Sequence, residues 1–185
     1  MSRIKQLATE NATDRGRTML DAVRHKLGLV PNMTRAMANS AAVLDGYLQF
    51  SGALSRGALP AKVREQLSLA VAEANGCDYC LAAHSPIGKT VGLTAEQVQD
   101  SWAGTAVDPK ADALIRFALQ VLETRGRVGD AALTDVRQAD FDDAAIAEVV
   151  AHVALDVFTN YFNNLAHTDV DFPKAAPLTA EPAGV

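Results

Sequence analysis

Two helices joined by a tight turn are predicted by the segment PAKVREQLSLAVAEANGCDYCLAAH, residues 60–84. Pro60 suits the first turn of a helix, because its missing N–H and fixed φ cost little there. Asn75-Gly76 is a favourable C-terminal stop for that helix. A second helix then begins at Cys77 or Asp78, so the segment predicts a helical hairpin with its only two cysteines just after the turn.

Apolar residues recur at helical spacing through most of the remaining chain, and the alternation typical of a strand is not found. We expect Pro86 to kink or end the helix that begins near Cys77, because its ring clashes with the preceding turn. The other predicted helices are residues 14–28, 34–55 with an interruption near Asn39-Ser40 left open, a short helix after Thr94 that contains Trp102, 109–123, 130–139 and 142–165. The chain is therefore predicted to be an all-α bundle, with one domain over residues 1–173 and a disordered Ala/Pro-rich tail over 174–185.

A weak internal similarity appears when the sequence is shifted by 83 residues. The matched pairs are Glu65 with Glu148, Cys77 with Asn160, Cys80 with Asn163, and His84 with His167. A two-fold helical repeat would place two similar hairpins in the domain, of which only the first keeps its thiols. Identities are few, so chance similarity is an equal alternative.

Composition limits the class of function. The chain has 185 residues, 49% of them hydrophobic and 21% charged, which is enough to bury a core without disulfide or metal staples. Its net charge of −5 provides no basic surface for nucleic acid. The N-terminal residues lack the apolar region of a secretory signal, and no apolar run approaches the ~20 residues of a membrane span. We therefore expect a cytoplasmic protein with no nucleic-acid or membrane partner.

The residues that carry chemistry are Glu65, Cys77, Cys80 and His84. On a helix, positions 77, 80 and 84 project within roughly 60° of one another, so both sulfurs and the imidazole can share one face. A helix N-terminus and a protonated histidine both stabilise a thiolate, which attacks a peroxide oxygen or a disulfide. The sulfenic acid that forms condenses with a nearby thiol, and Glu65 on the preceding helix can orient His84.

Spacing alone does not establish which cysteine attacks. The helix dipole favours Cys77 at the helix start, whereas the neighbouring base favours Cys80, one turn before His84. We prefer Cys80, because every turnover requires protons to be removed and returned.

The same residues also allow structural interpretations, as alternatives to a reactive thiol pair. A C-x-x-C pair is half of a zinc site, in which His84 and one of Glu65, Asp78 or His152 would complete the ligands. No second C-x-x-C is present, however. Two inert, buried cysteines on a helix are a further alternative.

At these residues the chain resembles the alkylhydroperoxidase D-like group of the carboxymuconolactone decarboxylase superfamily. The resemblance is carried by the run from Arg64 to His84 with its Glu, Cys, Cys and His at matching spacing. The later run NYFNNLAHTDVDFP, residues 160–173, is similar to the end of the peroxidase-related branch of that group.

The resemblance implies an all-helical bundle that assembles as trimers or hexamers and needs no metal or organic cofactor. It implies that Cys80 reacts with the peroxide, that Cys77 is its disulfide partner, and that Glu65 and His84 form the proton relay. The alkylhydroperoxidase D protein is re-reduced through a lipoylated adaptor. This chain departs from it at Tyr79, which stands where that protein has a second histidine, so the efficiency of the relay and the reductant are both open.

The prediction that follows is a thiol-dependent hydroperoxidase of antioxidant type, which takes a hydroperoxide and an external dithiol, lipoylated or thioredoxin-like. Two alternatives are a decarboxylase like that of the superfamily's name, which would not require a C-x-x-C, and a non-enzymatic redox-sensing or zinc-binding dithiol protein. A homo-oligomer is also expected, because an aromatic share of only 5% leaves long Ala/Val helix faces to bury.

Overall fold

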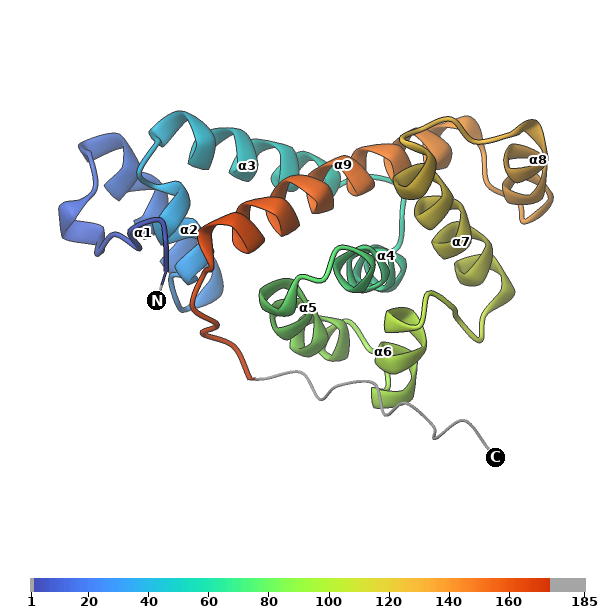
Figure 1. Cartoon of the computed structure of the whole chain (residues 1–185), viewed down its shortest axis with the longest axis horizontal. Helices are drawn as coiled ribbons and strands as arrows, with labels where there is room; N and C mark the ends of the chain where they lie inside the picture. Colours follow the sequence, from blue (N-terminus) through green and yellow to red (C-terminus); the bar gives the residue numbers. More distant parts are fainter. Residues whose placement is uncertain (1, 174–185) are drawn as a thin grey trace.

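A computed structural model describes residues 2–173 of the chain (Figure 1), so the predicted tail at 174–185 lies outside the described residues. The described part is helical, with no strand. Its elements are the 3₁₀ turn η1 (Thr9–Asn11) and the α-helices α1 (Asp14–Leu27), α2 (Asn32–Met37), α3 (Ala41–Leu54), α4 (Ala61–Ala74), α5 (Asp78–Thr90), α6 (Ala95–Trp102), α7 (Pro109–Thr124), α8 (Asp130–Gln138) and α9 (Asp143–Ala166). The all-α prediction is confirmed.

Helix starts follow capping chemistry that is visible in the sequence. Thr94 and Gln97 form a reciprocal capping box at the start of α6. Asp108 caps α7, with Pro109 in its first turn, and the Asp142 side chain accepts from the Ala145 N–H at the start of α9. These side chains satisfy N–H groups that a helix leaves without an internal partner.

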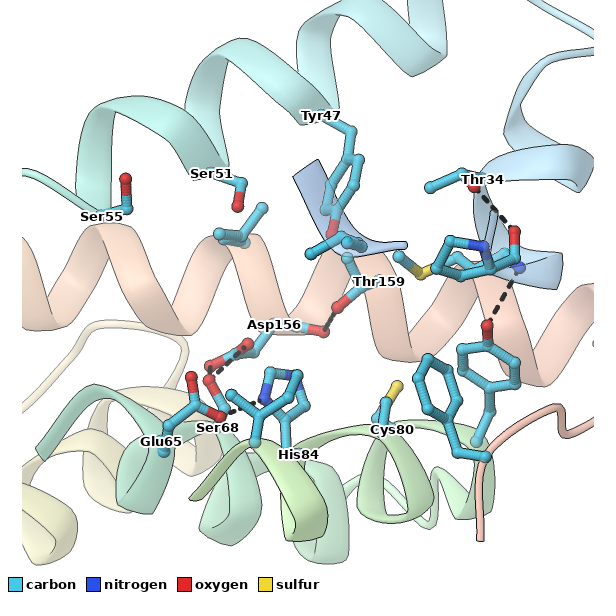
Figure 2. Close-up of a pocket in the computed structure, with 18 of the residues that line it drawn as sticks. Thr34, Tyr47, Ser51, Ser55, Glu65, Ser68, Cys80, His84, Asp156 and Thr159 are labelled. Atoms are coloured by element: carbon cyan, nitrogen blue, oxygen red, sulfur yellow. Dashed lines mark hydrogen bonds and ion pairs between the residues drawn. The ribbon is translucent and has the colours of Figure 1, made fainter. Parts of the chain in front are cut away.

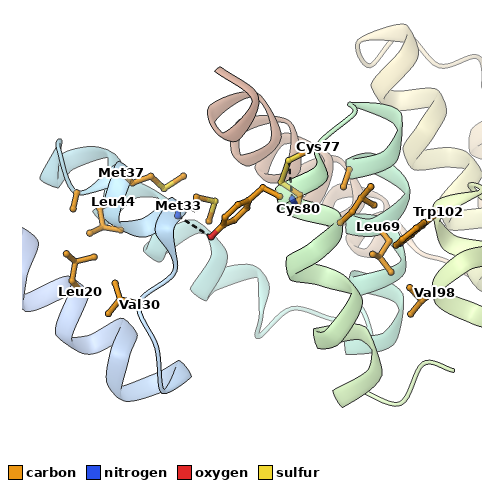
Figure 3. Close-up of a cluster of buried hydrophobic side chains, with 14 of the residues drawn as sticks. Leu20, Val30, Met33, Met37, Leu44, Leu69, Cys77, Cys80, Val98 and Trp102 are labelled. Atoms are coloured by element: carbon orange, nitrogen blue, oxygen red, sulfur yellow. Dashed lines mark hydrogen bonds between the residues drawn. A yellow bond between two sulfur atoms is a disulfide. The ribbon is translucent and has the colours of Figure 1, made fainter. Parts of the chain in front are cut away.

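The helix α4 lies at the centre of the bundle. It packs against α5, α6, α7 and α9, while α3 and α9 run side by side over it (Figure 1). Side chains of α4 belong to two different clusters of buried hydrophobic residues. One cluster contains Leu69 together with Met37, Leu44 and Trp102 (Figure 3). The other contains Leu67 together with Leu114, Ile115 and Val149. Full burial of each such side chain contributes about 1.5–3 kcal/mol. Both clusters therefore hold α4 in place, and with it every residue that α4 carries into the site.

Two helices differ in detail from the sequence expectation. Residues 34–55 form two helices rather than one, because the Ser40 side chain accepts from the Val43 N–H and starts α3 there. Pro86 does not end α5, which continues to Thr90. The helix end is held by packing instead, since Gly88 lets it approach Leu93 and the Leu93 N–H bonds the Gly88 carbonyl.

The predicted repeat is wrong as a pair of hairpins. Residues 143–166, which would contain the second hairpin, form one unbroken helix. The turn of the first hairpin depends on Gly76, which has a φ of +59°, and the second segment has Thr159 at the matching position. A β-branched residue is strained at positive φ, so the helix continues there.

Within residues 2–173, α9 is the one helix long and apolar enough to cross a membrane by length and composition. Of its most apolar window, 44% is buried inside the protein. The core helix of a soluble protein passes the same test, so length and composition alone are weak evidence for a membrane span.

One contact fixes the connection between α3 and α4 onto α9. The Glu148 carboxylate accepts backbone hydrogen bonds from Ala58 at 2.7 Å and Leu59 at 3.0 Å. Gly57 leaves room for it, because a Cβ there would lie 2.4 Å from a Glu148 oxygen. This carboxylate, which the repeat paired with Glu65, is a cap for a loop and lies outside the thiol site.

Replacing Glu148 with alanine should lower the free energy of unfolding by about 1–3 kcal/mol, because two N–H groups lose their acceptor. Urea unfolding followed by circular dichroism measures this loss. Glu123→Ala, at an exposed position of α7, is the matched control. Equal midpoints for the two variants would contradict the role given to Glu148.

Candidate functional site

A cavity of about 570 Å³ lies between α3, α4, α5 and α9 (Figure 2). Its walls also include Leu29 and Pro31 before α2, Met33 and Thr34 at the start of α2, and the end of the described chain at Phe172 and Pro173. Leucine, methionine and aromatic side chains form much of the lining, and polar groups gather on the α4, α5 and α9 sides. Three of the four predicted site residues, Glu65, Cys80 and His84, line this cavity.

The two cysteines form a disulfide at the start of α5 (Figure 3). Cys77 is the N-cap residue of that helix, and its sulfur accepts from the Cys80 N–H at 3.3 Å. Their Cα atoms are 5.3 Å apart. Both side chains are buried, yet only Cys80 lines the cavity. The geometry therefore distinguishes two sulfurs that spacing alone does not separate.

His84 and Glu65 make the contact that the sequence predicted. His84 Nδ1 lies 2.8 Å from Glu65 Oε2, which joins α5 to α4 across the hairpin. Burial acts to lower the pKa of His84, but the Glu65 carboxylate beside it, its hydrogen bond and the charge of Asp156 together raise that pKa above its ordinary value. His84 stands one turn after Cys80 on the same helix, so the imidazole lies close to the cysteine pair.

Asp156 is a site residue that sequence reasoning missed. It is 4% exposed, lies on α9, and accepts hydrogen bonds from the Ser68 hydroxyl at 3.1 and 3.2 Å (Figure 2). Burial raises its pKa from the ordinary 3.8 to about 7, although His84 and Ser68 act in the opposite direction. The available signal was an acidic residue inside a long, apolar predicted helix, which often marks a functional carboxyl group.

The same face of α9 carries further polar residues toward the cavity. They are His152, Asp156, Thr159 and Asn163, at spacings of four, three and four residues. Asn163 at one end of this row lies against Cys80, with its Nδ2 3.4 Å from the Cys80 sulfur. The sequence comparison paired Asn163 with Cys80 as repeat partners, whereas in the folded chain these two residues are in contact.

Tyr79, between the cysteines, has a different set of partners from His84. Its hydroxyl donates to Asp171 at 2.9 Å and accepts from the Met33 N–H at 3.2 Å, and its ring meets Phe172 edge-on at 5.6 Å. Burial raises the pKa of its phenol, which keeps it neutral. Tyr79 thus ties the segment at Asp171 and Phe172 over the cavity, and takes no part in the His84–Glu65 contact.

In the zinc alternative, His84 and one of Glu65, Asp78 or His152 would join the two cysteines as ligands. Within residues 2–173, no group of three or more His, Cys, Asp or Glu side chains is placed to hold a metal ion.

The sequence matches one known protein family over part of its length. Residues 41–124 match the model of the carboxymuconolactone decarboxylase family. The matched residues make up less than half of the chain. No curated protein sequence matches it. The predicted resemblance is therefore confirmed by the family segment together with the fold.

Among solved structures, an uncharacterised peroxidase-related protein from Ralstonia eutropha JMP134 with an alkylhydroperoxidase AhpD core is similar, with a TM-score of 0.85, 24% identity and 92% of each chain covered. A peroxidase-related protein from Silicibacter sp. TM1040 gives 0.79 at 19% identity, covering 90% of this chain and 89% of that one. The debrominase Bmp8 gives 0.76 at 15% identity, covering 91% and 92%. At these identities the likeness establishes the alkylhydroperoxidase D-like fold alone.

The buried carboxyl group predicts a specific pH dependence. The pKa of Asp156 is higher in the folded protein than in the unfolded chain, so its contribution to stability is present below about pH 4 and is lost as the pH rises through about 7. Asp156→Asn, which resembles the protonated acid, should therefore raise Tm at pH 8 and change it little at pH 4. Thermal unfolding between pH 4 and 8 measures this.

Ser68→Ala is the companion variant, since it removes a hydroxyl that stabilises the Asp156 carboxylate. In Ser68→Ala, the loss of stability as the pH rises should therefore be larger than in the wild type. Parallel Tm-against-pH curves for wild type and Asp156→Asn would show that the carboxyl group is not perturbed.

Proposed function

We propose that the protein is a thiol-dependent hydroperoxidase in which Cys80 reacts with the peroxide and Cys77 closes the disulfide. The observation that carries this proposal is the placement of the two sulfurs, with Cys80 on the cavity wall and Cys77 behind it within bonding distance. The His84–Glu65 pair one turn away supplies the acid–base groups. The peroxidase-related names of two similar structures support a general antioxidant role.

The reaction begins from the reduced dithiol. The Cys80 thiolate attacks the terminal oxygen of a hydroperoxide, the O–O bond breaks, and the leaving alkoxide takes a proton from His84 and departs as an alcohol. Cys80 is left as a sulfenic acid. The Cys77 thiol then attacks the Cys80 sulfur, which releases water and forms the disulfide. One hydroperoxide and two thiols thus become one alcohol, one water and one disulfide.

An external dithiol completes the cycle by thiol–disulfide exchange, and its chemistry is that of a lipoylated or thioredoxin-like reductant. Glu65 positions His84 and holds its proton, because the carboxylate favours the charged imidazole. No metal or organic cofactor is needed in these steps. We propose a cytoplasmic location, where such dithiol reductants operate.

A second candidate is reductive dehalogenation by the same dithiol. A further structure of Bmp8, a cysteine-to-alanine variant in complex with 2,3,4-tribromopyrrole, has a TM-score of 0.75 to this chain at 14% identity. The large, partly apolar cavity beside Cys80 is suited to an aromatic ligand of this kind. Here an aryl bromide and two thiols would become the arene, hydrogen bromide and the disulfide.

Single-turnover oxidation tests the assignment. Reduced protein given one equivalent of cumene hydroperoxide should lose two thiols per peroxide consumed. Cys80→Ser should abolish peroxide loss, because the attacking thiolate is gone. Cys77→Ser should still consume one peroxide and lose one thiol, leaving a sulfenic acid that a dimedone probe traps.

Peroxide consumption that survives in Cys80→Ser and disappears in Cys77→Ser would exchange the two roles. Thiols that stay unreacted for hours would exclude the peroxidase. The same protein incubated with 2,3,4-tribromopyrrole distinguishes the second candidate, because only dehalogenation releases bromide.

We also propose that the protein is a homo-oligomer, a trimer or hexamer by its resemblance. Four large apolar side chains are exposed on α9 and recur at helical spacing: Val150, Phe158, Tyr161 and Leu165. Such a stripe suits burial against a second copy.

Phe158→Glu should shift the mass measured by light scattering toward that of a monomer, because a carboxylate would have to be buried in the interface. Val107→Glu, at an exposed apolar position outside α9, should leave the mass unchanged. A monomeric wild type would contradict the proposal.

A further inference from the structure

Asn163 makes a hydrogen bond to the reacting sulfur. Its side chain is 3% exposed, and its Nδ2 donates to Cys80 Sγ at 3.4 Å and to Met33 Sδ at 3.2 Å. Among the described residues it is the one side chain that donates to the Cys80 sulfur. The amide orientation follows from these partners, because both sulfurs are acceptors and only the NH₂ end of the side chain can donate to them.

The other end of this amide has no partner. Asn163 Oδ1 is buried and lacks a hydrogen-bond donor within the described part of the chain. A buried polar atom without a partner lowers stability, so an apolar side chain of similar size would suit this position better if it served packing alone. The amide is therefore poorly explained as a structural residue, and its one productive end contacts the sulfurs.

The two cysteine sulfurs have separate donors. The Cys77 sulfur accepts from the Cys80 backbone N–H at the helix start, away from the cavity. The Cys80 sulfur accepts from Asn163 on the facing helix α9, and both residues line the cavity. A hydrogen bond to a sulfur strengthens when that sulfur becomes a thiolate, because the acceptor then carries a full charge. Reduction of the disulfide should thus strengthen the Asn163 bond at the sulfur that faces the substrate.

We propose that Asn163 is a catalytic residue, whose amide N–H stabilises the Cys80 thiolate and holds it facing the cavity. The assignment rests on the proposed function, since it names the group that prepares the attacking sulfur. It adds a donor on α9 to the acid–base pair on α4 and α5, so three elements contribute to the reaction.

Other groups also influence the thiol and must be kept constant in a test. The charged or titratable groups on the same cavity are Lys26 on α1, Arg64 and Glu65 on α4, His84 on α5, and His152 and Asp156 on α9. The phenols of Tyr47 and Tyr79, whose pKa values burial raises, are neutral. A variant at Asn163 changes none of these side chains.

The test measures the pKa of Cys80 directly. In a Cys77→Ser background, the rate of alkylation by iodoacetamide as a function of pH reports the single remaining thiol. Asn163→Leu should raise that pKa by about one to two units, the effect of losing one charge-assisted hydrogen bond, and slow alkylation near neutral pH at least about tenfold. Asn163→Asp, nearly isosteric, should raise it further because an ionised carboxylate repels the thiolate.

Thermal stability separates catalysis from structure. Asn163→Leu should leave Tm unchanged or higher, because it removes a buried oxygen that has no partner, whereas a structural hydrogen bond would lower Tm on removal. Asn164→Leu, at the exposed neighbouring asparagine, is the matched control and should leave the thiol pKa unchanged. Should Asn163→Leu fail to fold, Asn163→Asp still decides the question.

The alkylation experiment uses no peroxide. It therefore tests the role of Asn163 independently of the proposed hydroperoxidase activity. A Cys80 pKa equal to wild type in both Asn163 variants would overturn the role of Asn163, even if the protein consumes peroxide. A raised pKa in a protein whose wild-type thiols ignore peroxide would overturn the peroxidase and leave the hydrogen bond in place.

Discussion

The tight turn at Asn75 and Gly76 is the constraint on which the site depends. Gly76 takes a φ of +59°, which a residue without Cβ adopts at little cost, and the Cys77 N–H bonds back to the Ala72 carbonyl. The chain therefore reverses within a few residues, and α5 lies against α4 (Figure 1). This reversal brings Glu65 to His84 and leaves Cys77 as the N-cap of α5. A longer or looser connection would separate the acid–base pair from the thiols.

Around this hairpin the protein pairs several buried or partly buried polar groups. Glu65 contacts His84, and Asp156 accepts from Ser68, within one cavity (Figure 2). Each pair offsets part of the cost of removing charge from water. Because these groups interact with one another, their proton affinities are coupled, and the cavity can hold or release a proton near neutral pH. This property suits a reaction that needs both a thiolate and a proton donor.

Much of the fold was predictable because its signals are local. Caps at Thr94 and Asp108 and the stop at Gly76 act within a few residues, so reading the chain in order finds them. The failures concern Pro86 and the internal repeat. Pro86 should end a helix, yet the contact of Gly88 with Leu93 holds the next turn in place. The internal repeat failed because the second segment has no glycine where the first one turns.

By itself the sequence determined an all-helical chain, the hairpin that carries the thiols, and the quartet of Glu65, Cys77, Cys80 and His84. These depend on residues close together in the chain, whose relative positions helix geometry and one turn specify. Only the tertiary structure decided which sulfur faces the cavity, and that Asp156 and Asn163 of α9 join the site. Those residues lie about eighty positions beyond the cysteines, and their approach follows from how α9 packs on α4 and α5. Contacts of that kind depend on the complementary shapes of distant helices, which no short stretch of sequence specifies.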